Sequence, residues 1–74
     1  MRREIIHVAD TGPPGRTYTN LLSRVRTALD TVYAGATVIE RTDTVTTIFH
    51  LDGRRTRITG ECATVHIVLE YPDA

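Results

Sequence analysis

The sequence has a single cysteine, no tryptophan and no lysine, and each shortage narrows what the chain can be. Cys62 cannot form a disulfide within the chain, which favours a reducing compartment. All nine basic residues are arginine, and nine acidic residues balance them to a formal net charge of zero. This balance provides no global attraction to nucleic acid or to an anionic membrane.

Long apolar runs are also missing. The pair Ile5-Ile6 is interrupted at His7, so the N-terminus does not have the pattern of a signal peptide, and no run approaches the roughly 20 residues that a membrane-spanning helix needs. The sequence therefore predicts a soluble, cytoplasmic protein. At 74 residues we expect one domain, residues 1–74, which buries only about 60% of its unfolded surface and gains stability from association.

Three stretches before residue 36 predict local structure. Residues 4–9 alternate in polarity as a short strand does, and residues 11–16 contain two prolines and two glycines, which predict a loop. From about residue 18 to residue 33 the apolar residues recur every three or four positions, which indicates an amphipathic helix of about four turns. Thr17 or Thr19 is expected to cap its start, and Gly35 to end it.

The largest predicted feature is a hairpin from residue 36 to residue 71. Asp52-Gly53, between runs rich in Val, Ile and Thr, predicts a type I′ turn with these two residues at its centre. This register pairs Leu51 with Arg54 and Val45 with Gly60. In an unbroken ladder, it separates two apolar sets onto opposite faces: Val45, Phe49, Leu51 and Ile58 near the tip, and Val38, Val65, Ile67 and Leu69 near the base.

Two arrangements can resolve this conflict. Bulges near Thr42–Thr44 and Gly60–Glu61 would bring both apolar sets to one face. Alternatively, the hairpin is two-faced, with its base packed on its own helix and its tip packed on another copy of the chain. The sequence leaves both open.

These elements predict an α+β fold in the order β-α-β-β, with one amphipathic helix packed on one face of a small, mainly antiparallel sheet with a long C-terminal hairpin. The other face of the sheet would remain open. Apolar residues inside a polar rim are typical of an interface. The candidate partner-binding residues on this face are Ile5, His7, Ile39, Arg41, His66 and Val68.

The order of a strand, a helix and a long terminal hairpin resembles that of dodecins, small flavin-binding proteins that assemble into hollow shells. The resemblance covers element order alone and implies the fold class given above. Dodecins are expected to carry a flavin-stacking aromatic residue just after the helix. This chain has Ala36-Thr37-Val38 there, so the resemblance does not extend to flavin binding.

The loop that begins Gly12-Pro-Pro-Gly resembles the phosphate-binding loop of P-loop ATPases. Thr17-Tyr18-Thr19 stands where that motif requires Gly-Lys-Thr, so we do not expect nucleotide hydrolysis. Amides at the start of the helix could still bind an anion beside an arginine, and arginines also flank the hairpin turn. The candidate anion-binding residues are Arg16, Arg55 and Arg57.

Other chemical groups are too scattered to predict a reaction. His7, His50 and His66 lie on different predicted strands, at positions too far apart for one zinc ion. Cys62 lies on a strand, with no helix start beside it to activate a thiol. We assign no catalytic residues and expect no metal, no cofactor and no enzymatic activity. We do not expect nucleic acid as a partner.

The leading hypothesis is a non-enzymatic protein–protein interaction module. It would associate with itself, as a dimer or a larger assembly, and bind another protein, as small phage or mobile-element proteins do when they inhibit or regulate a host machine. The alternative is a homo-oligomer that holds a small anionic ligand at subunit boundaries, near the three candidate arginines.

Overall fold

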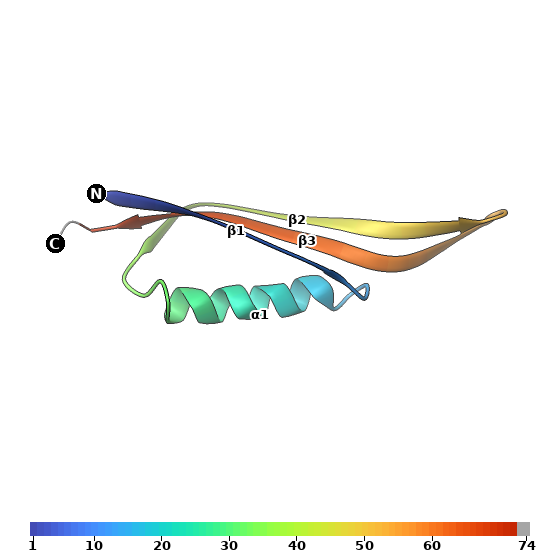
Figure 1. The fold of residues 1–74 in the computed structure, drawn as a ribbon, viewed down its shortest axis with the longest axis horizontal. Coiled ribbons are helices and arrows are strands. Elements are labelled where there is room, and N and C mark those ends of the chain that lie inside the picture. The colour runs from blue at the N-terminus through green and yellow to red at the C-terminus, as the bar shows by residue number, and fades with distance from the viewer. Residues whose placement is uncertain (73–74) are drawn as a thin grey trace.

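The computed structural model describes residues 1–72, which form one helix and three strands (Figure 1). In chain order these are β1 (Arg2–Gly12), α1 (Thr17–Asp30), β2 (Thr37–Asp52) and β3 (Arg55–Tyr71). Both strand pairs are antiparallel, and the sheet order is β1-β3-β2. The α+β class, the β-α-β-β order and the long C-terminal hairpin are confirmed.

The element bounds differ from those expected. β1 is longer at both ends, because its whole length pairs with β3, from Arg2 opposite Tyr71 to Gly12 opposite Glu61. α1 ends at Asp30, three residues earlier than the periodicity suggests, and a turn follows. Gly35 has a φ of 88° in that turn, so glycine does supply the left-handed residue before β2.

The hairpin turn lies one residue later than predicted. Asp52 pairs with Arg55, so the central residues are Gly53 and Arg54, and the predicted pair of Leu51 with Arg54 is replaced by Leu51 with Thr56. Gly53 has a φ of 61°, and within residues 1–72 positive φ values occur at glycines alone. A type I′ turn centred on Asp52 would require positive φ at that aspartate. Glycine at the first central position, as in a type II′ turn, avoids this cost.

Two bulges give the hairpin a common apolar face, which was the first of the two open arrangements. One extra residue on β3, Thr59, separates Ile58 (opposite Phe49) from Gly60 (opposite Ile48). This bulge is close to the expected position. The second lies at Ile39 on β2, and the predicted bulge at Thr42–Thr44 is wrong, because pairing runs without a shift from Glu40 to Ile48.

The hydrophobic core lies between α1 and the base of the hairpin. Alternate residues of the central strand β3 are almost completely buried, and Leu21 and Val25 of α1 cover them with help from Ile6 and Val8 of β1. Burying a valine, leucine or isoleucine side chain completely stabilises a fold by about 1.5–3 kcal/mol. The buried β3 residues are Ala63, Val65, Ile67 and Leu69.

Part of the hairpin projects beyond the rest of the molecule. β1 ends at Gly12, which lies opposite Glu61, and Glu61 in turn lies opposite Thr47. Residues 48–60 therefore continue as two strands only, which we call the arm. Figure 1 shows the arm extending past the end of β1 and the start of α1, and the described chain measures 61 × 17 × 11 Å.

Candidate functional site

A row of exposed apolar side chains lies along the arm and its base. Val45 lies opposite Ala63, and Phe49 lies opposite Ile58, on the same face of the sheet as the core. The helix covers only the other end of this face. The members of this row, which we call the arm stripe, are Val45 (45% exposed), Phe49 (56%), Leu51 (71%) and Ile58 (52%).

The opposite face of the arm is polar. His50 lies opposite Arg57 and Asp52 opposite Arg55, so these four side chains share the face away from α1, with Ile48 at its base. On the helix side, residues 45–51 of β2 and 56–58 of β3 present Val, Thr, Phe, Leu and Ile and no charged side chain. The arm is therefore amphipathic, as expected of a hairpin that is buried on one side.

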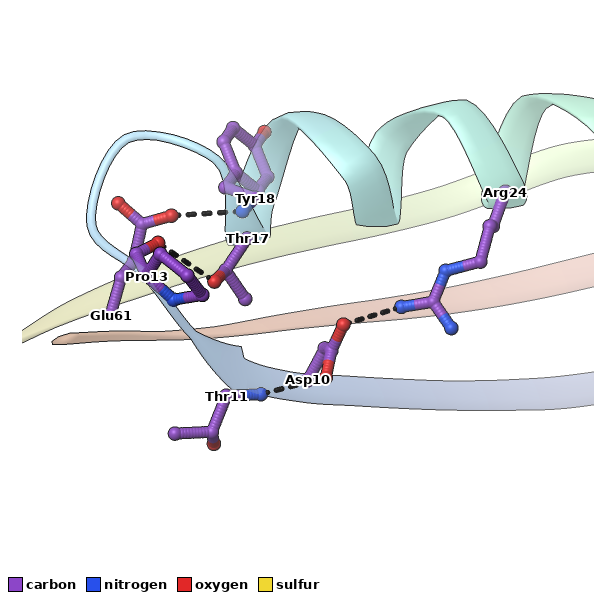
Figure 2. A network of polar contacts seen from close by, with 7 residues as sticks. All are labelled: Asp10, Thr11, Pro13, Thr17, Tyr18, Arg24 and Glu61. Atoms are coloured by element: carbon purple, nitrogen blue, oxygen red, sulfur yellow. Dashed lines mark hydrogen bonds and ion pairs between the residues drawn. The ribbon is translucent and has the colours of Figure 1, made fainter.

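The start of α1 is capped by a residue that is distant in the sequence. Glu61 accepts a hydrogen bond from the backbone N–H of Tyr18 (2.8 Å) through one carboxylate oxygen (Figure 2). Its other carboxylate oxygen accepts from the backbone N–H of Gly15 (3.3 Å). The prediction that Thr17 or Thr19 caps the helix is wrong. The side chain of the N-cap residue, Arg16, makes no capping hydrogen bond. The Thr17 hydroxyl donates instead to the carbonyl oxygen of Pro13 (2.9 Å).

This cap bears on the candidate anion site. The N–H groups that would bind an external anion already donate to the carboxylate of Glu61. The positive end of the helix dipole stabilises the negative charge of this carboxylate. Arg16 follows the loop on the helix side of the sheet, whereas Arg55 and Arg57 face the other side. The structure thus does not bring the three candidate arginines into one site within a chain.

A second polar cluster links α1 to β2. The Tyr18 hydroxyl donates to Asp43 Oδ2 (2.6 Å), and Arg41 donates through Nε and Nη2 to the two oxygens of the same carboxylate (2.9 and 3.0 Å). The hydrogen bonds from Arg41, and then that from Tyr18, hold the pKa of Asp43 below its usual value. The hydrogen bond to Asp43 raises the pKa of Tyr18. The cluster fixes the start of α1 to an edge strand.

This cluster corrects the expected position of Arg41. We expected it on the open sheet face, but it pairs with the buried Ile67 and points to the helix side. The bulge at Ile39 reverses the alternation of side chains before residue 41, so Arg41 points to the helix side. A bulge after residue 41, as expected from the sequence, would have left it on the open face. Ile39 itself is the extra residue of that bulge and is 44% exposed.

Four of the six candidate partner-binding residues do lie together on the open sheet face. Ile5 pairs with Val68 and His7 pairs with His66, so the four form two adjacent cross-strand pairs. The imidazole rings meet edge to face, with centroids 5.9 Å apart at an angle of 62°. Ile5 is 67% exposed.

An open hollow lies between α1 and β2, because the helix packs on β1 and β3. Its volume is about 720 Å³, and Leu22, Leu29 and Tyr18 supply apolar surface. Arg26 and Arg41 line its polar part together with Asp30. Since Val45 follows Asp43 on the same face of β2, the arm stripe begins beside the end of this hollow.

His50 lies far from the other two histidines. It is eight residues along β2 from Thr42, which lies opposite His66, and this corresponds to about 26 Å of strand. Within residues 1–72, no group of three or more His, Cys, Asp or Glu side chains is arranged to hold a metal ion. The same residues contain no helix that is both long and apolar enough to cross a membrane.

Comparison with protein-family models, with curated proteins and with solved structures finds no match to this chain.

Proposed function

We propose that this chain is a non-enzymatic protein–protein interaction module that associates with itself through the arm stripe. The observation that supports this proposal most directly is that Phe49, Leu51 and Ile58 are each more than half exposed on a projecting hairpin. We place this function in the cytoplasm, in keeping with the lone cysteine, Cys62.

The arm has little stability of its own. An isolated two-stranded hairpin is at best marginally stable in water, and stability requires a third strand or packing on a hydrophobic face. Within the described residues 1–72, the arm has neither, since β1 ends at Gly12 and α1 covers the other end of the sheet. A protein surface packed on the arm stripe would supply the missing contacts.

The chemistry of the stripe favours a protein over a small ligand or nucleic acid. Small ligands bind in concave pockets with a few converging polar groups, whereas the stripe runs for about 20 Å along the arm and its base. Nucleic acid requires basic side chains toward its phosphates, and Arg55 and Arg57 face away from the stripe. An uncharged apolar strip fits the core of a protein–protein interface.

Molar mass in solution tests the proposal. We expect light scattering on a size-exclusion column to give at least twice the chain mass of 8.3 kDa at low and at high salt, because apolar contacts are not screened. The double substitution Phe49→Ser with Ile58→Ser is expected to give a monomer. A wild-type mass of one chain at both salt concentrations, or an unchanged mass for the double variant, would contradict the proposal.

The matched control is Ile5→Ser, which removes an apolar side chain that is even more exposed (67%) from the opposite face of the sheet. It should leave the molar mass unchanged. Circular dichroism of each variant establishes that the fold is kept. In the arrangement proposed, the open sheet face with Ile5, His7, His66 and Val68 remains available for a different protein.

A further inference from the structure

The helix side of the molecule restricts how any surface can cover the arm stripe. α1 packs on the same face of the sheet, and its start lies beside the near end of the stripe. The Tyr18 hydroxyl contacts Asp43, two residues before Val45, and the Tyr18 N–H contacts Glu61, which lies opposite Thr47. The far end of the stripe is Leu51, next to the turn. A covering surface must therefore be about 20 Å long and must stop where the helix begins.

A second copy of the chain has such a surface. We propose that two chains stack their arms face to face, antiparallel, about a two-fold axis near Ile48, so that Leu51 of each lies over Val45 of the other. This inference rests on the proposed function and specifies its partner and geometry. An isologous contact of this kind buries both stripes at once.

Antiparallel stacking follows from the position of the helices. If the two arms ran in the same direction, both α1 helices would lie at the same end of the interface, on its inner side, and would occupy the same space. Reversing one arm moves the helices to opposite ends. Stacked sheets lie about 10 Å apart, which is the thickness that large apolar side chains from both sides fill.

The stripe alone exposes less area than a stable interface buries, so the two chains must also touch outside the stripe. Counting about 200 Å² for a fully exposed large side chain, the four exposed fractions leave roughly 450 Å² of stripe per chain. A stable interface buries about 800 Å² on each partner. In the antiparallel arrangement the turn of each arm reaches the start of the partner's α1, where Tyr18 and Leu22 at the near end of the hollow provide further apolar surface.

Chemical cross-linking tests this geometry. In a Cys62→Ala background, a chain that carries both Val45→Cys and Leu51→Cys should form covalent dimers with a bismaleimide that spans about 10 Å. Within one chain the two thiols are about 20 Å apart, so this reagent cannot join them. Each single variant should remain uncross-linked, because antiparallel stacking holds identical positions about 20 Å apart.

The outcomes separate this inference from the proposed function. Covalent dimers of the double variant alone support antiparallel stacking. Efficient cross-linking of Leu51→Cys by itself would overturn it in favour of tip-to-tip contact. If the double variant sediments as a dimer but does not cross-link, the arms do associate and the proposed geometry is wrong. If the double variant and the Cys62→Ala parent are both monomers, the antiparallel geometry and the proposed self-association are both wrong.

Discussion

The carboxylate of Glu61 accepts a hydrogen bond from the backbone N–H of Tyr18 at 2.8 Å, although 43 positions separate the two residues in the sequence. Glu61 also lies opposite Gly12, the last residue of β1, and opposite Thr47, the last residue of β2 before the arm. One side chain thus links the helix start to the point at which the sheet narrows from three strands to two.

Glu61→Ala should destabilise the fold by about 1 kcal/mol, which is typical for loss of a helix cap. The reason is that the amides of Tyr18 and Gly15 lose their acceptor and the positive end of the helix loses its neighbouring charge. Urea denaturation followed by circular dichroism measures the change. Glu70→Ala, which removes a partner of the exposed Arg3, is the control and should cost less. Equal costs for the two variants would contradict this account of the cap.

Asp43→Asn should lower thermal stability more at pH 7 than at pH 3. The hydrogen bonds from Arg41 and Tyr18 hold the folded-state pKa of Asp43 below that of the unfolded chain. Its contribution is therefore complete above the unfolded pKa of about 4 and is lost as the pH falls through the lower folded value. Melting curves of both proteins between pH 7 and pH 3 measure this difference. A difference that widens toward acid pH would reverse the assigned sign.

Gly60→Ala should destabilise the fold by about 1 kcal/mol, even though alanine is usually the better residue in a strand. A Cβ atom at this position would lie 3.2 Å from the carbonyl oxygen of Gly12 and 3.4 Å from Cδ1 of Ile48. The end of β1 would have to move away from β3. Chemical denaturation measures the cost, and Thr44→Ala on the exposed part of β2 is the comparison. A stabilised Gly60→Ala variant would indicate that β1 yields at this end without cost.

Ile67→Val should cost about 0.5–1.5 kcal/mol, because it removes one methylene from the centre of the core, where Ile67 is 1% exposed. Val32→Ala removes more side chain, but from a residue that is 74% exposed, and should change stability by less than about 0.5 kcal/mol. Denaturation midpoints of the two variants measure the contrast. A larger effect at Val32 than at Ile67 would show that the helix end is covered in the assembled protein.

Local signals in the sequence were sufficient for the elements of the fold. Spacing of three and four residues identified α1, and the prolines and glycines of residues 11–16 identified the loop before it. Alternation and Gly53 identified the hairpin. These signals succeed because each depends on residues that are neighbours along the chain.

The two bulges were one of the two arrangements that the sequence left open. Apolar residues on opposite faces of an unbroken ladder are costly unless both faces are covered, so the conflict between Phe49 and Ile67 predicted either an irregularity or a two-faced hairpin. The conflict is resolved equally well by an extra residue at several positions. For this reason the bulge near Gly60 was anticipated closely, whereas that at Ile39 was expected several residues later.

By itself, then, the sequence determined the class of fold, the helix and the hairpin, and it left a register change as one of two alternatives. Only the tertiary structure decided which strand ends where, and with it the arm. The exposure of Phe49 and Leu51 depends on β1 ending at Gly12 and on α1 packing at the other end of the same face. Such an end point is set by pairing between residues about 50 positions apart, such as Gly12 and Glu61, and no local periodicity encodes it.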